Sequence, residues 1–379
     1  MSEQQIVAFR AIDRPVSKEN LKYMRQQSTR AEITPWAFDN EYEYGDFRGN
    51  KLEMLRRGYD LHLHTANFGI RTLMIRLPHG LPNHSELKRY LLKNGLAFLK
   101  DNQGPGGCLC IEPCYEPGEL EDIWEIDELL ERLIPVRAEL MNGDLRPLYL
   151  AHLAVAGDNN HDPDEMLEAP VPAGLGSLSK AQQALAEFYC LSEDLIAAAA
   201  MESLPLPASG TAELEGGYAE WVRKLPTDLK NDWLTALLND SDAPVRAEML
   251  TRFRDEFSPP AWPTSPPRRT ITELHAATDE IAEKREQRTV AKTAKDRKQR
   301  LAKMAADPSI ALRESERLVA QRTGAAYRQA AELLADLREA LAGSDQSGLA
   351  EKQAHKLKNR YPKLHLLTGE LRKRGFVPK

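Results

Sequence analysis

The sequence predicts an α+β protein: an N-terminal α/β sandwich with a mixed sheet, then a helical domain, then a long basic helix with a C-terminal helical bundle. Three observations lead to this prediction. Segments with strand-like alternation occur only in the first part of the chain, apolar residues at helical spacing dominate after residue 177, and a proline-rich break precedes a long charged stretch. Hydrophobic residues make up 42% and charged residues 28%, which is typical of a chain with a packed core.

The first domain is expected over residues 1–157. Strands are predicted at 5–12, 33–44, 59–68, 70–77 and 108–112, and helices after Ser17 and at 50–57 and 119–140. Ser17 offers an N-cap oxygen to the free amides of the first helix, and Gly69 lies where a hairpin must turn. Together these elements account for a sheet covered by helices.

A helical domain is expected over residues 177–257, after a connecting segment that contains three prolines. Its helices are predicted at 180–189, 192–202, 218–238 and 244–257. Residues 258–269 contain five prolines, which cannot continue a helix, and we interpret this segment as a linker. A long helix at 270–305 and a bundle to the end of the chain form the last part, 270–379.

Charge is divided unevenly along the chain. Residues 268–379 contain 25 Lys and Arg against 15 Asp and Glu, whereas residues 1–267 contain 26 against 42. The net charge of −6 therefore combines an acidic front half with a basic tail. Such asymmetry is typical of a basic arm that meets nucleic acid or an acidic partner, and the front half of the chain is itself a candidate partner.

The compartment expected from the sequence is the cytoplasm. No stretch approaches the ~20 apolar residues that cross a bilayer, so no membrane partner is expected. The first ten residues lack a basic start followed by an apolar run. The four cysteines are too few for a disulfide framework.

The candidate binding residues lie in the basic tail, on the long helix and in the last helices. A largely basic helix surface could follow a phosphate backbone, while a solvated helix with ordinary ion pairs is the alternative. The candidates for contact with DNA, RNA or a partner protein are Lys284, Arg288, Lys292, Lys295, Lys303, Lys356, Lys358, Arg360, Arg372, Lys373 and Arg374.

A second candidate site is the strand that carries Asp60, His62 and His64. The period of two along a strand places these three residues on one face, where they could bind a divalent metal. The segment resembles the opening strand of polymerase-and-histidinol-phosphatase-type metal phosphoesterases, and more loosely that of amidohydrolases. That resemblance implies a metal-dependent phosphoesterase. The other interpretation is a non-catalytic protein that binds no cofactor.

The cysteine pattern favours core packing over zinc binding. Cys108 and Cys110 share one face of a strand, and only Cys110 and Cys114 have the spacing of a zinc ligand pair. Small apolar side chains on such a face usually fill a core.

Residues 317–375 resemble the C-terminal helical segment of bacterial SWIM-type zinc-finger proteins. The resemblance rests on Tyr-Arg-Gln-Ala-Ala-Glu-Leu-Leu-Ala-Asp-Leu-Arg at 327–338 and on the closing segment 366–375; the zinc finger itself is absent. Segments 9–15 and 143–149 resemble an uncharacterised bacterial family associated with those proteins and with SNF2-type helicases. This resemblance implies a SWIM-type or SNF2-type helicase partner and a role in antiviral defence.

Together these patterns predict a non-catalytic interaction or scaffold subunit of a multiprotein assembly. Other protein subunits are expected partners, and the basic helices, partly as a coiled coil, would contact them or a nucleic acid. The sequence indicates no particular reaction, so we expect an interaction protein rather than an enzyme.

Overall fold

The chain forms two compact units, Met1–Ala282 and Glu283–Lys379. The computed structural model describes residues 4–43, 45–78, 80, 87–102, 106–115, 126–157, 161–206, 212–239, 245–256 and 261–378. Each unit has hydrophobic clusters of its own. The division lies inside the long helix and not at the proline-rich segment, where the composition predicts a boundary.

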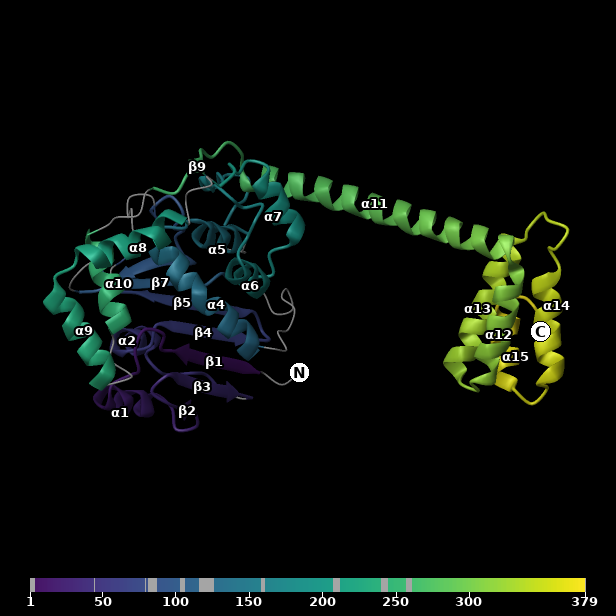
Figure 1. The fold of residues 1–379 in the computed structure, drawn as a ribbon, viewed down its shortest axis with the longest axis horizontal. Coiled ribbons are helices and arrows are strands. Elements are labelled where there is room, and N and C mark those ends of the chain that lie inside the picture. Colours follow the sequence, from purple (N-terminus) through teal and green to yellow (C-terminus); the bar gives the residue numbers. More distant parts are fainter. Residues whose placement is uncertain are drawn as a thin grey trace. The chain divides into compact units, whose positions relative to one another are not determined.

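A seven-stranded sheet forms the centre of the first unit (Figure 1). Its order is β2-β3-β1-β4-β5-β7-β6. The strands are β1 (Gln5–Arg10), β2 (Glu32–Ile33), β3 (Ala37–Tyr42), β4 (Leu61–Ala66), β5 (Ile70–Leu77), β6 (Leu96–Lys100) and β7 (Gly107–Ile111). The predicted hairpin of β4 and β5 is confirmed, and Gly69 at its turn has a φ of 101°.

The α+β class is confirmed, but the predicted mixed sheet is wrong, because every described strand pair of this sheet is antiparallel. Because a helix connects β1 to β2, these two strands run in the same direction. However, β3 lies between the two and pairs antiparallel with both. Parallel neighbours therefore never form.

Helices cover both faces of the sheet, as the predicted sandwich requires. One face carries α1 (Lys18–Gln27) and α2 (Lys51–Arg57), and the other carries α4 (Ile126–Met141), α5 (Arg146–Ala156) and α6 (Lys180–Phe188). The Ser17 side chain caps α1 as predicted, because its oxygen accepts a hydrogen bond from Asn20 N. The predicted helix over 119–140 is confirmed from Ile126 onward, and its residues 119–125 lie outside the described part.

The segment that we predicted as a separate helical domain is divided between two cores. Helix α6 and α7 (Glu193–Ala200) share the core of the sheet and of α4 and α5. Helices α8 (Ala212–Lys224), α9 (Thr227–Asn239) and α10 (Val245–Glu256) share a smaller cluster around Trp221, Trp233 and Phe253. The single helix predicted over 218–238 is wrong, because the chain breaks at Pro226 between α8 and α9.

The proline-rich segment packs onto the first unit over its described residues, 261–269. Strand β9 (Thr264–Ser265) pairs with β8 (Val171–Pro172), and Trp262 Nε1 donates to Ala173 O at 3.1 Å. The Arg269 guanidinium lies 2.6 Å from the Glu168 carboxylate, which is 1% exposed. The predicted linker is therefore an anchored extended segment; its residues 258–260 lie outside the described part.

The long helix and the bundle have the predicted positions. Helix α11 (Ile271–Ala306) is followed by α12 (Pro308–Ala320), α13 (Gly324–Ala340), α14 (Leu349–Arg360) and α15 (His365–Lys373). The four bundle helices bury a core that includes Tyr327, Leu334, Leu357 and Leu371. Thr323 caps α13 through a hydrogen bond from Ala326 N, and Asp307 caps α12 through one from Ser309 N.

Candidate functional site

His62 and His64 share one face of β4, as the period of two predicts, and both are buried. The His62 ring stacks on Phe9 with 4.1 Å between ring centroids, and its Nδ1 donates to Ala8 O at 3.1 Å. His64 Nε2 lies 2.9 Å from Gln5 Oε1. Burial, with a smaller contribution from Lys51, lowers the pKa of His64 to about 4, and burial holds the pKa of His62 well below its ordinary value. Both rings are therefore neutral parts of the core.

Asp60 does not join the two histidines. It precedes β4, and its Oδ2 accepts hydrogen bonds from Ile12 N at 2.7 Å and Asp13 N at 3.2 Å. Its Oδ1 lies 3.1 Å from the Arg137 guanidinium of α4. Within the described residues, no group of three or more His, Cys, Asp or Glu side chains is placed to hold a metal ion. The geometry gives no support to the metal alternative.

The cysteines fit the predicted core role. Cys108 and Cys110 lie in β7 and pack in the cluster beneath α1 and α2, whereas Cys114 is exposed. Burial raises the pKa of the Cys108 thiol to about 11 and also raises that of Cys110, so neither supplies a thiolate near neutral pH.

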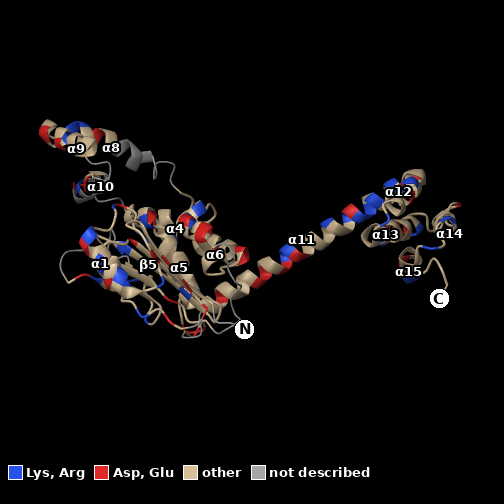
Figure 2. Cartoon of the chain, turned by 90° about the horizontal axis from the view of Figure 1, so that it is seen from below, with Lys and Arg blue, Asp and Glu red and all other residues tan. Residues whose placement is uncertain are grey.

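The first half of the basic tail candidates lies on the exposed part of α11. Every residue from 283 to 300 is exposed, and Figure 2 shows the blue basic residues that predominate toward the end of this helix. With 3.6 residues per turn, one side of the helix carries cations at successive spacings of three to five residues. We call this side the basic face of α11; it comprises Lys284, Arg288, Lys292, Lys295, Lys298 and Lys303.

Three cations of the basic face of α11 have no carboxylate at the spacing of an intrahelical ion pair. For Arg288, Lys295 and Lys298, no Asp or Glu stands three or four residues away on either side. The positions that neighbour them carry Lys, Arg, Ala, Leu or Gln instead. Like charges at these spacings each destabilise a helix by about 0.2–0.5 kcal/mol. The helix therefore carries a concentration of positive charge that its own sequence leaves unbalanced.

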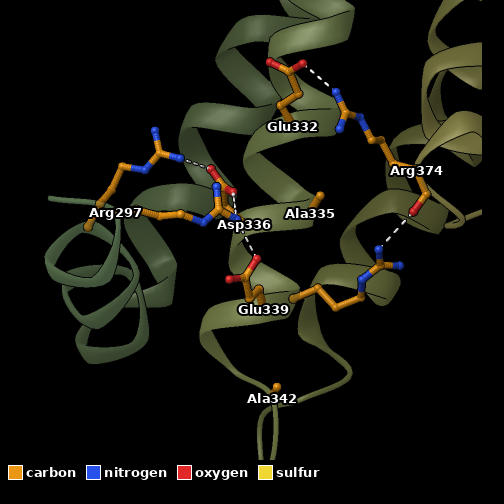
Figure 3. A pocket seen from close by; sticks show the side chains of 9 residues that line it. Arg297, Glu332, Ala335, Asp336, Glu339, Ala342 and Arg374 are labelled. Atoms are coloured by element: carbon orange, nitrogen blue, oxygen red, sulfur yellow. Dashed lines mark hydrogen bonds and ion pairs between the residues drawn. The ribbon is translucent and has the colours of Figure 1, made fainter. Parts of the chain in front are cut away.

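The opposite side of α11 carries two arginines that do have partners in the bundle. Arg297 lies 2.5 Å from Glu339 and 3.3 Å from Asp336 of α13, and Arg300 pairs with the same Asp336. Figure 3 shows these side chains at the edge of a groove of about 590 Å³ between α11, α13 and α15. The lining residues are Arg297, Arg300, Glu332, Ala335, Asp336, Arg338, Glu339, Ala342 and Arg374.

The groove is a structural contact more than a binding site, because its charges neutralise one another. Arg374 lies 2.6 Å from Glu332, and Arg338 donates to Arg374 O at 3.0 Å (Figure 3). The ion pairs of Arg297 and Arg300 with α13 hold the end of α11 against the bundle. As a result, the basic face of α11 points away from α13.

Most of the predicted cations in the bundle also have carboxylate partners. Lys356 lies 2.8 Å and Arg360 4.0 Å from Glu316, and Lys373 lies 2.6 Å from Glu370. Arg374 pairs with Glu332 as described above, and Arg372 donates to Pro378 O at 3.1 Å. Lys358 is half-buried on α14. The structure thus separates the basic face of α11 from a bundle in which most of the candidate cations are paired.

Sequence reasoning missed the different roles of neighbouring basic residues on α11. Arg297 and Arg300 look like further members of a basic run, but their partners lie some forty residues later in the chain. Spacing within the helix is the one sequence signal available, since it places both arginines opposite Lys295.

Comparison with protein-family models, with curated proteins and with solved structures finds no match to this chain. Among the described residues, no helix has both the length and the apolar character needed to cross a membrane. Any assignment of function therefore depends on the geometry above.

Proposed function

We propose that this protein is a non-catalytic interaction subunit that binds nucleic acid through the basic face of α11. The observation that carries this proposal is the row of exposed cations without intrahelical carboxylate partners at Arg288, Lys295 and Lys298. A polyanion would relieve the repulsion within that row and release its own condensed counterions on binding.

The test compares two triple variants that remove the same charge from the same unit of the full-length protein. Arg288→Ala/Lys292→Ala/Lys295→Ala removes part of the basic face, and Lys356→Ala/Arg360→Ala/Lys373→Ala removes cations that have carboxylate partners. Fluorescence anisotropy with labelled DNA and RNA at low salt measures the affinity. We expect the first variant to weaken binding by roughly one to two orders of magnitude and the second by less than about threefold.

Two results would contradict the proposal. The first is a wild-type protein that binds neither DNA nor RNA at low salt. The second is an equal loss in both variants, which would mean that net charge and not the basic face of α11 governs binding.

The partners expected from the resemblance remain predictions. A SWIM-type or SNF2-type helicase in a cytoplasmic defence assembly fits a subunit that contributes binding surface and no reaction. Co-expression with such a protein, followed by size-exclusion chromatography, tests it; separate elution of the two proteins would remove that partner.

A further inference from the structure

The exposed part of α11 has a composition that distinguishes between classes of nucleic acid. Residues 283–306 contain no Phe, Tyr, Trp or His. Proteins that hold single strands stack the bases on aromatic side chains, and each stacked base contributes about 1–3 kcal/mol. The basic face of α11 offers a single strand nothing to replace that contribution except the planar group of Arg288.

The spacing of the cations suits a regular backbone. Arg288 and Lys303 are separated by roughly 22 Å along the helix at 1.5 Å per residue. A double helix carries one negative charge per ≈1.7 Å of its axis and keeps its phosphates in a fixed array. A flexible single strand would first have to be ordered to meet the same row of cations, and that ordering costs conformational entropy.

The side chains of this face favour phosphates over bases. Lysine binds phosphate as a point charge without a fixed geometry, and four of the five cations from Arg288 to Lys303 are lysines: Lys292, Lys295, Lys298 and Lys303. The hydroxyls of Thr289 and Thr293 donate to Arg285 O and Thr289 O, both at 2.9 Å, within the helix, and the spacing places Thr293 on the side of Arg297 and Arg300. These side chains therefore offer few groups that could recognise particular bases.

We infer that the basic face of α11 binds double-stranded nucleic acid along its phosphate backbone, without preference for sequence. This inference rests on the proposed function, because it specifies the class of nucleic acid that the same face binds. If the five cations from Arg288 to Lys303 all contact phosphates, the logarithm of the association constant should fall with the logarithm of the salt concentration with a slope of about −4 to −5 on a B-form duplex.

The experiment uses the full-length protein and four labelled probes of one length: two DNA duplexes of unrelated sequence and one single strand from each. We expect both duplexes to bind with affinities within about threefold of each other and at least roughly tenfold more tightly than the single strands. In Arg288→Ala/Lys292→Ala/Lys295→Ala, the salt slope on a duplex should fall to about −2, because each lost phosphate contact removes about 1.

The possible failures are distinguishable. Single strands that bind as tightly as duplexes, with the same loss in the triple variant, would overturn the inference and leave the proposed function intact. A strong preference for one duplex sequence would also overturn the inference. If neither these four DNA probes nor RNA bind at low salt, both the inference and the proposed function are contradicted. Polyglutamate that displaces a duplex at equal charge concentration would overturn the inference in favour of an acidic protein partner.

Discussion

At the scale of single residues, the histidines of β4 illustrate the difference between a chemical motif and a core. The sequence correctly predicts that His62 and His64 share a face, because side chains alternate along any strand. A ligand role fails for a tertiary reason: the Asp60 carboxylate is occupied by two backbone amides and by Arg137, and His62 is fully buried against Phe9. The two rings fill the core as neutral groups.

These buried histidines predict a stability that decreases in mild acid. The pKa of His64 is about 4 in the folded protein and about 6.5 in an unfolded chain, so the unfolded state binds more protons between these values. The free energy of unfolding should therefore fall as the pH decreases from about 6.5, with His64 contributing up to about 1.4 kcal/mol per pH unit. Urea unfolding at several pH values measures this slope.

The control is an exposed histidine. His64→Gln should make the slope between pH 6.5 and 5 shallower, whereas His275→Gln on the surface of α11 should leave it unchanged. If His64→Gln retained the wild-type slope, the ring would not be the group that titrates.

At the scale of elements, the proline-rich segment is not the free linker that its composition predicts. Five prolines correctly exclude a helix, but they do not make residues 261–269 a free linker. Strand β9, Trp262 and Arg269 attach the segment to residues that lie some seventy to one hundred positions earlier. Local sequence contains no information about those partners.

Two adjacent arginines test this anchoring. Arg269→Ala should lower the free energy of unfolding by about 3–5 kcal/mol, because it leaves the buried Glu168 carboxylate without its guanidinium. Arg268→Ala removes the same charge from an exposed position and should change stability by less than about 0.5 kcal/mol. Chemical denaturation of both variants makes the comparison; equal effects would show that the ion pair does not anchor the segment.

At the scale of the whole molecule, the chain contains two units with separate cores, and the division lies within α11. The acidic and basic halves of the sequence correspond approximately to these units, since the second begins at Glu283. The three-part layout predicted from composition differs from this, because α6 and α7 pack with the sheet.

The two cores predict two unfolding transitions. Leu334→Ala in the bundle core should destabilise the second unit by about 2–5 kcal/mol and leave the first transition in place. Leu63→Ala in the sheet core should have the reverse effect. Calorimetry with hydrogen exchange of each segment measures both, and one transition that shifts equally in both variants would contradict independent units.

The sequence by itself determined the features that depend on near neighbours. The cap at Ser17, the alternation of β4 and β5, the long helix, and the polarity of charge all follow from interactions over a few residues or from composition. Only the tertiary structure decided the antiparallel order of the sheet, the partners of Asp60, and the pairing of Arg297 and Arg300 with α13. These three features depend on which distant segments come into contact when apolar surface is buried. Local periodicity contains no information about those contacts. The same tertiary contacts distinguish the paired cations of the bundle from the basic face of α11.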